Sequence, residues 1–245
     1  MRYLIKFSYD GTSFYGYQKQ NDLRTVEKEL ENALFNINDH LITRVFAAGR
    51  TDRGVHALCQ CAHFDIDVDI TAYKLKCAIN SLTPDDIHVF SAEAVDIDFH
   101  ARFHAVQKTY IYKLNVGEYS PIDRNYIYQY NKDLDLSSMQ VAIKDFLGKH
   151  DFKSFTSDEV IKDNYERTIT EASVTRDGDI ITFCFKGNGF MKYQVRNMVG
   201  TLIKVGKGKL HPSIIKEIFE DSTLKKHIYT APPQGLYLAD IVYKK

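Results

Sequence analysis

The sequence predicts an α+β protein made of two pseudo-repeated halves, each with the element order β-α-β-β-α-β. Three observations support this prediction: strand-like alternation of apolar residues, helix-like apolar spacing between those strands, and recurrence of the same order in the second half. We expect halves of residues 1–104 and 105–245, with their sheets side by side and a central basic cleft. No Pro- or Gly-rich linker separates them, so a shared core is expected.

The first half is predicted from residue periodicity. Residues 2–9 alternate apolar and polar side chains, as a half-buried strand does. Thr25 precedes a helix in which Val26, Leu30 and Leu34 share one face, and Glu27 and Glu29 suit its N-terminal end. The remaining predicted elements are strands 43–48 and 57–66, a helix 72–82 and a strand 87–97.

The second half repeats the order with a hairpin that turns at Asp177-Gly178. Pro212 is expected in the first turn of a short helix ending near Glu220. The predicted elements are strand 106–116, helix 136–147 closed by Gly148, hairpin 169–185, helix 190–205, the short helix and strand 236–243. This split βαβ unit is ferredoxin-like and is shared by RNA-recognition domains, although a fold alone is weak evidence for function.

Composition indicates a globular chain of 245 residues with 44% hydrophobic residues and zero net charge. No run approaches the roughly 20 apolar residues that span a bilayer, and the N-terminus begins with a strand pattern, so we expect a cytoplasmic protein with no membrane partner. The four cysteines form no C-x-x-C pair and are expected to be reduced core thiols. Cys59, Cys61 and His63 alternate along one strand face, a pattern that a metal site or core packing could explain, and core packing is favoured.

Basic residues are concentrated in two acid-free segments, 99–117 and 180–216. The second contains seven of them: Lys186, Lys192, Arg196, Lys204, Lys207, Lys209 and Lys216. If the two segments meet in space, they form a positive cleft suited to a phosphate backbone. The alternative is a set of ordinary solvated lysines.

Residues 49–56 (GRTDRGVH) place the Asp52 carboxylate between two arginines in a loop bounded by glycines and flanked by predicted strands. Gly49 and Gly54 allow backbone turns that would project Asp52 from the sheet. A catalytic carboxylate and an ordinary solvated turn residue are both compatible with this octamer alone.

Motifs along nearly the whole chain resemble those of the tRNA pseudouridine synthase A family. The Asp52 loop and the C-terminal run are the most specific. The matching segments are residues 9–18 (YDGTSFYGYQ), 24–31, 49–57, 80–87 (NSLTPDDI), 99–103 (FHARF), 108–110, 150–152, 195–200 (VRNMVG) and 231–238 (APPQGLYL).

The resemblance implies isomerisation of uridine to pseudouridine in the tRNA anticodon stem-loop, at positions 38–40. It implies tRNA as partner, no cofactor, no metal and a homodimer. The reaction needs a carboxylate beside the sugar and a dry pocket around the base. It also needs the target nucleotide flipped out of its stack, which costs a few kcal/mol.

The resemblance also assigns the site residues. Asp52 acts as a nucleophile on C1′ or as a base on the ribose, and the sequence does not choose between them. Arg196 keeps Asp52 ionised, Tyr110 stacks on the uracil, and Arg50 fills the place of the flipped base. The alternative for Tyr110 is an ordinary core tyrosine. The alternative for Arg50 is a surface arginine that touches phosphate. Phosphate contacts are expected from Lys186, Lys192, Lys204, Lys207 and Lys209.

Two departures from the family pattern are Tyr17, where Trp is usual, and Lys192-Tyr193-Gln194 before Arg196. They raise the alternative of a divergent paralogue that acts on another uridine. A catalytically silent RNA-binding module is a second alternative, opposed by the intact set of Asp52, Tyr110 and Arg196. A glycoside hydrolase or nuclease ranks last, because no second carboxylate occurs in a comparable loop.

Overall fold

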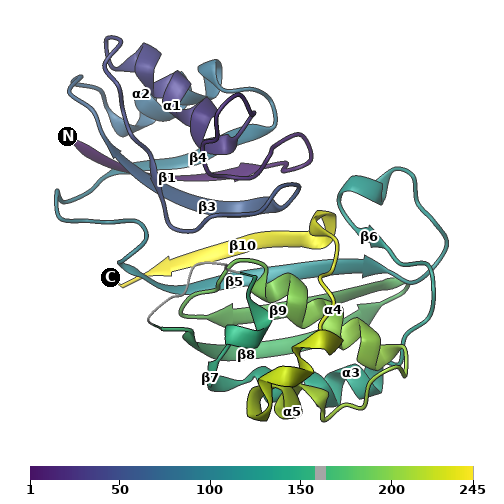
Figure 1. Ribbon diagram of the computed structural model, residues 1–245. Helices are drawn as coiled ribbons and strands as arrows, with labels where there is room; N and C mark the ends of the chain where they lie inside the picture. Colours follow the sequence, from purple (N-terminus) through teal and green to yellow (C-terminus); the bar gives the residue numbers. More distant parts are fainter. Residues whose placement is uncertain (158–163, 245) are drawn as a thin grey trace. The chain divides into compact units, whose positions relative to one another are not determined.

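The structure is a computed structural model that describes residues 1–157 and 164–244. The chain forms two compact units (Figure 1). Unit 1 contains Met1–Val106 and the C-terminal strand from Leu238 onward, and unit 2 contains Gln107–Tyr237. The division near residue 106 lies close to the boundary expected from the sequence, but the last strand groups with unit 1 instead of unit 2.

Unit 1 is a mainly antiparallel sheet with two helices packed together against it (Figure 1). Its strand order is β4-β1-β3-β10, and the short β2 also pairs with β3. Alternating side chains of β1, such as Ile5 and Phe7, are fully buried, as are Leu30 and Leu34 of α1. The elements are β1 (Arg2–Tyr9), α1 (Val26–Ile37), β2 (Phe46–Ala47), β3 (His56–Asp65), α2 (Ala72–Leu82), β4 (Ile87–Ala94) and β10 (Leu236–Tyr243).

Unit 2 contains the strands β5-β9-β8-β7 in antiparallel order, with the short β6 parallel to β5. Helix α3 packs against both α4 and β8, and Phe146, Phe152 and Phe155 form an aromatic core. The strands and α-helices are β5 (Ala105–Asn115), β6 (Tyr128–Gln129), α3 (Leu136–Ala142), β7 (Gly148–Asp151), β8 (Glu166–Asp177), β9 (Ile180–Gly187), α4 (Gln194–Gly206) and α5 (Ile214–Glu220). The 3₁₀-helices are η1 (Asp123–Asn125), η2 (Ile143–Phe146), η3 (Lys153–Phe155), η4 (Ser222–His227) and η5 (Pro233–Gly235).

The α+β class is confirmed, and helix 72–82 and strand 236–243 have their predicted limits. Several boundaries were wrong, including the end of strand 87–97, which stops at Ala94. Strand 43–48 shrinks to two residues, helix 136–147 continues as η2 after Ala142, and α5 begins at Ile214, beyond Pro212. Helix 190–205 begins only at Gln194, because Tyr193 before it is left-handed, with φ 60°. The hairpin turns at Gly178 and Asp179, since Asp177 still pairs with Ile180.

The cysteines differ in exposure more than the sequence suggested. All four are free thiols; Cys61 is buried, and Cys59 and Cys184 are partly buried. The expectation of a core thiol was wrong for Cys77, which is exposed because α2 buries Leu75 and Ile79 on its other side. Within residues 1–157 and 164–244, no His, Cys, Asp or Glu side chains group to hold a metal ion, and no helix has the length and apolarity to cross a membrane.

Candidate active site

The Asp52 loop, residues 49–56, connects β2 to β3 in unit 1 and holds Asp52 half-buried. The Val55 N–H donates to the Asp52 carbonyl at 3.2 Å, which closes the turn. Gln60, on β3, donates from Nε2 to the Gly49 carbonyl at 2.8 Å. Gly54 has φ 75°, a left-handed value that favours glycine. The backbone on both sides of the carboxylate is therefore fixed.

A second loop, residues 9–17, packs behind the Asp52 loop, and we call it the supporting loop. The Tyr9 and Thr51 hydroxyls lie 2.7 Å apart in the interior, and the Tyr17 N–H donates to the Thr51 carbonyl at 3.1 Å. Burial raises the pKa of Tyr9 to about 12, so its phenol keeps its proton near neutral pH. The residue before Asp52 is thus held by both ends of the supporting loop.

Two glycines bring the backbones of these loops into close contact. A Cβ on Gly11 would lie 2.0 Å from the Val55 carbonyl oxygen. Gly16 has φ +97°, and its Cβ would lie 3.0 Å from the Thr51 carbonyl oxygen. No other residue type fits this spacing without moving the backbone, so the glycines determine where the Asp52 loop lies.

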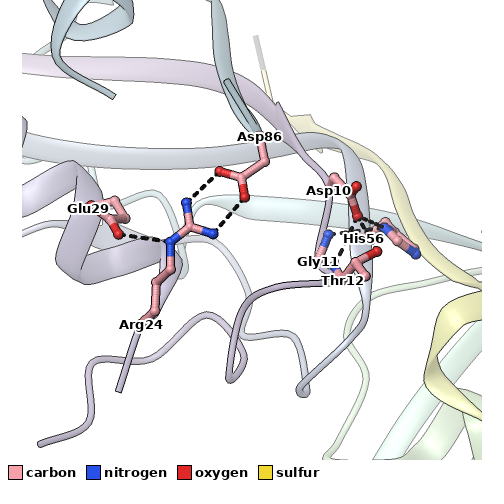
Figure 2. Close-up of polar contacts among 7 residues, drawn as sticks. All are labelled: Asp10, Gly11, Thr12, Arg24, Glu29, His56 and Asp86. Atoms are coloured by element: carbon pink, nitrogen blue, oxygen red, sulfur yellow. Dashed lines mark hydrogen bonds and ion pairs between the residues drawn. The ribbon is translucent and has the colours of Figure 1, made fainter. Parts of the chain in front are cut away.

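His56 ends the Asp52 loop and fixes it to Asp10 and Gly11 (Figure 2). The buried imidazole accepts the Gly11 N–H at Nδ1, at 3.0 Å, and the same nitrogen lies 3.1 Å from Oδ1 of Asp10. Asp10 also accepts from the Thr12 N–H and hydroxyl, at 2.9 and 2.6 Å. The two contacts of Nδ1 call for different protonation states, since the Gly11 N–H needs a lone pair on Nδ1 and an ion pair with Asp10 needs a proton there.

Arg24 anchors the supporting loop to the rest of unit 1 (Figure 2). Its guanidinium donates two hydrogen bonds to Asp86, at 2.7 and 2.8 Å, and one to Glu29 at 3.2 Å. It also lies 4.3 Å above the centre of the Phe14 ring. The hydrogen bonds with Asp86 raise the pKa of Arg24, as expected for a guanidinium between carboxylates.

Tyr110 lies on β5 in unit 2 and is 7% exposed. Its ring meets the Phe190 ring edge-on, with centroids 5.1 Å apart, and it pairs with Phe185 on β9. Edge-to-face packing of this kind holds an aromatic ring in one orientation. Tyr110 is therefore packed into unit 2 against the Phe190 ring.

Arg196 lies in the first turn of α4, and both its side chain and its backbone contact Ala231. Its Nε donates to the Ala231 carbonyl at 2.8 Å, and the Ala231 N–H donates to the Arg196 carbonyl at 3.0 Å. The guanidinium also lies 4.7 Å from the Tyr193 ring centre. Residues 229–231 approach α4 closely because Gly200 of that helix has no side chain. A Cβ on Gly200 would lie 1.8 Å from the Tyr229 carbonyl oxygen.

Comparison with known proteins identifies the family of the chain. The family model described as "tRNA pseudouridine synthase" matches residues 5–104 and 142–244. The chain belongs to this family. The tRNA pseudouridine synthase A of Streptococcus equi subsp. equi (strain 4047) is 43% identical over 247 residues, covering 100% of this chain and 99% of that protein. That of Streptococcus pneumoniae serotype 19F (strain G54) is 42% identical with the same coverage.

Members of the tRNA pseudouridine synthase family are isomerases, so the prediction of the enzyme class is confirmed. A solved structure titled "Crystal Structure of a Cbf5-Nop10-Gar1 Complex" aligns with a TM-score of 0.34 and 10% identity, covering 91% of this chain and 68% of that chain. This likeness is too low to support a statement about the fold.

In this tRNA pseudouridine synthase family member, the predicted site residues are divided between the units. Asp52 and Arg50 belong to unit 1; Tyr110, Arg196 and the five lysines belong to unit 2. Arg50 is exposed. Within unit 2, the structure brings Lys192 and Arg196 together around the Tyr193 ring.

The five lysines differ in their contacts. Lys186 forms a 2.7 Å ion pair with Glu171, and Lys204 donates to the His227 carbonyl at 2.9 Å. The other three, Lys192, Lys207 and Lys209, are exposed. A further anion at Lys186 would have to compete with Glu171.

Sequence reasoning missed the residues that position the Asp52 loop. They are Tyr9, Gly11, Gly16, Thr51 and His56. The glycine-rich motif at residues 9–18 is the signal in the sequence that points to them. Its glycines have a structural explanation in the backbone contacts they permit.

Proposed function

We propose that this protein converts uridine to pseudouridine in the tRNA anticodon stem-loop, at positions 38–40, without a cofactor and through the Asp52 carboxylate. The observation that carries the proposal is the half-buried Asp52, held on a fixed backbone by the supporting loop in a chain of the tRNA pseudouridine synthase family. A fixed carboxylate suits a reaction in which positive charge develops on the sugar.

The chemistry balances without a redox partner. The C1′–N1 bond breaks, and its electron pair leaves with the uracil. Asp52 either adds to C1′ or takes a proton from the ribose. After the base turns, C5 bonds to C1′, Asp52 is released in its starting form, the C5 proton is removed and N1 gains a proton.

The residues of unit 2 complete the proposal. Arg196 pairs with Asp52 and keeps it ionised, and the bond from its Nε to Ala231 supports this role because it fixes the guanidinium plane. Tyr110 stacks on the uracil, and its rigid contact with Phe190 supports that role. Arg50 fills the place of the flipped nucleotide, and Lys186, Lys192, Lys204, Lys207 and Lys209 contact phosphates.

The proposal includes an assembly and a location. The two pseudo-repeated halves place their sheets side by side around a basic cleft, and the protein acts as a cytoplasmic homodimer. Light scattering of the purified protein tests the dimer: a mass near twice 28.2 kDa is expected. A mass of one chain at micromolar concentration contradicts it.

Pseudouridine mapping after incubation with unmodified tRNA tests the function. Wild type should give product at positions 38–40. Asp52→Ala and Asp52→Asn should give at least about 1,000-fold less, a loss of about 4 kcal/mol in transition-state stabilisation, while still binding tRNA. Asp69→Asn is the matched control, because Asp69 is an exposed carboxylate in the same unit, and it should keep full activity.

The outcomes separate the alternatives. Activity that survives in Asp52→Ala removes Asp52 from the mechanism. Wild type that binds tRNA but leaves every uridine unchanged favours an RNA-binding module. Product at other uridines indicates a paralogue with a different target.

A further inference from the structure

Arg53 directly follows Asp52, and it is stacked on an exposed aromatic ring. Its guanidinium carbon lies 4.2 Å above the centre of the Tyr15 ring, and Tyr15 is 40% exposed. Gly16 holds the two together, because its α-carbon packs against the backbone of Asp52 and Arg53; a Cβ there would lie 3.3 Å from the Arg53 nitrogen. The supporting loop therefore positions Arg53 as well as Asp52.

The neighbouring residue offers an internal comparison. Phe14 carries the guanidinium of Arg24 at 4.3 Å, almost the same distance. The N–H groups of Arg24 are taken by Asp86 and Glu29 in bonds of 2.7 to 3.2 Å (Figure 2). Stacking on a ring leaves the edge of a guanidinium available for an anion, and in this pair the protein supplies the anion itself.

The Arg53 pair has the same stacking without an internal anion. Among residues 1–157 and 164–244, no carboxylate lies within ion-pair distance of Arg53, and the side chain is exposed. A planar guanidinium donates to a phosphate in the same two-pronged way as to a carboxylate. The RNA backbone supplies a phosphate at every nucleotide.

We propose that Arg53, held flat on Tyr15, binds an RNA backbone phosphate beside the nucleotide that enters the Asp52 site. This inference rests on the proposed function, which defines the RNA as substrate. Arg53 directly follows Asp52, so a phosphate at Arg53 belongs to the part of the RNA backbone that passes the Asp52 site. The contact holds the backbone in register while the base is turned, and it reads no sequence.

The phosphate contact of Arg53 differs from the role proposed for Arg50. Arg50 is also exposed, but no aromatic ring holds it in the part of the chain that the structure describes. Its side chain can reorient when RNA binds, as replacement of a flipped base requires. Arg53 is already oriented, which suits a phosphate contact that lasts through the reaction.

Salt-dependent binding of unmodified tRNA tests the inference, measured in the Asp52→Asn background so that no turnover occurs. Arg53→Ala should weaken binding about 5- to 10-fold at 0.1 M salt and reduce the slope of log affinity against log salt by about one. Arg53→Lys should keep the slope. Tyr15→Leu should weaken binding about 3-fold, whereas Tyr15→Phe keeps the ring and should bind like the background protein.

Arg44→Ala is the matched control, since Arg44 is an exposed arginine of the same unit. It should leave both affinity and slope unchanged. An unchanged slope in Arg53→Ala, or an equal loss in Arg44→Ala, overturns the phosphate contact. These binding results do not depend on turnover, so a wild type that forms no pseudouridine defeats the proposed function without deciding the Arg53 contact.

Discussion

The Asp52 loop and the first turn of α4 position their charged residues in different ways. Asp52 is held by contacts with a loop about 40 residues earlier, through two glycines, a pair of hydroxyls and a buried imidazole. Arg196 is held by its own helix and by two hydrogen bonds with Ala231. The loop therefore depends on backbone spacing between distant segments, while the helix residue depends on regular local structure.

This difference indicates where each region is vulnerable. A helix tolerates small changes in side-chain volume on its surface, but two backbones in direct contact tolerate none. His56 of the loop and His63 of β3 each accept a backbone N–H at Nδ1, whereas Arg196 is held by hydrogen bonds with Ala231. The predictions below test these two properties.

The largest effect is expected for Gly11→Ala. The added Cβ would lie 2.0 Å from the Val55 carbonyl oxygen, so the two loops must separate. We expect a loss of about 3 kcal/mol in the free energy of unfolding and at least about 100-fold in the single-turnover rate. Urea denaturation and rapid-quench pseudouridine assays measure the two quantities.

Gly208→Asn is the control for that experiment. Gly208 of unit 2 is left-handed, with φ +68°, and a Cβ there meets nothing within 4 Å. Asparagine tolerates this conformation, so stability should change by less than about 1 kcal/mol. Equal effects of both substitutions would mean that loop contact is not the cause.

An intermediate effect is expected from acid, through His63 of β3. Its Nδ1 accepts the Ala101 N–H at 3.1 Å, and burial together with the nearby His100 lowers its pKa from 6.5 to about 4. Between these values the unfolded chain binds a proton that the folded chain does not. The contribution of neutral His63 to the free energy of unfolding is therefore fully present above pH 6.5. It falls by about 1 to 2 kcal/mol as the pH decreases towards 4.

Hydrogen exchange of the β3 amides at pH 7 and pH 5 measures this loss, after correction for the intrinsic exchange rate. His63→Asn keeps an acceptor near the Nδ1 position and has no charge to gain. Its β3 amides should show a smaller change in opening free energy than those of wild type. The same pH dependence in the variant would assign the titration to another group.

The smallest effect is expected for Tyr9→Phe. Loss of the hydroxyl contact with Thr51 should cost about 1 kcal/mol, the usual net value of a buried hydrogen bond. The single-turnover rate should fall only a few-fold, because the glycine contacts remain. Thr51→Val and the double variant Tyr9→Phe/Thr51→Val complete a double-mutant cycle. A coupling energy near zero, from the single-turnover rates, would show that the Tyr9–Thr51 contact does not position Asp52.

The sequence predicted what depends on local periodicity. Helix α2 begins and ends as expected, and Arg196 lies on a helix because Val195, Val199 and Ile203 repeat at helical spacing. The left-handed Tyr193 was not predictable, since tyrosine seldom adopts that conformation and no pattern marks it. The contacts of Gly11 with Val55 and of Arg53 with Tyr15 were missed because they join segments about 40 residues apart.

Strand β10 comes at the end of the sequence, but most of it belongs to unit 1. It is made after the whole of unit 2, yet its residues from Leu238 onward belong to unit 1, next to β3. On the edge of β3 away from β1, β2 pairs only with Ala62 and His63, so most of the rest of that edge is unpaired until the late segment arrives. A ribosome that stalls before Leu238 would leave a nascent chain that contains the whole Asp52 loop but lacks the last strand of its sheet.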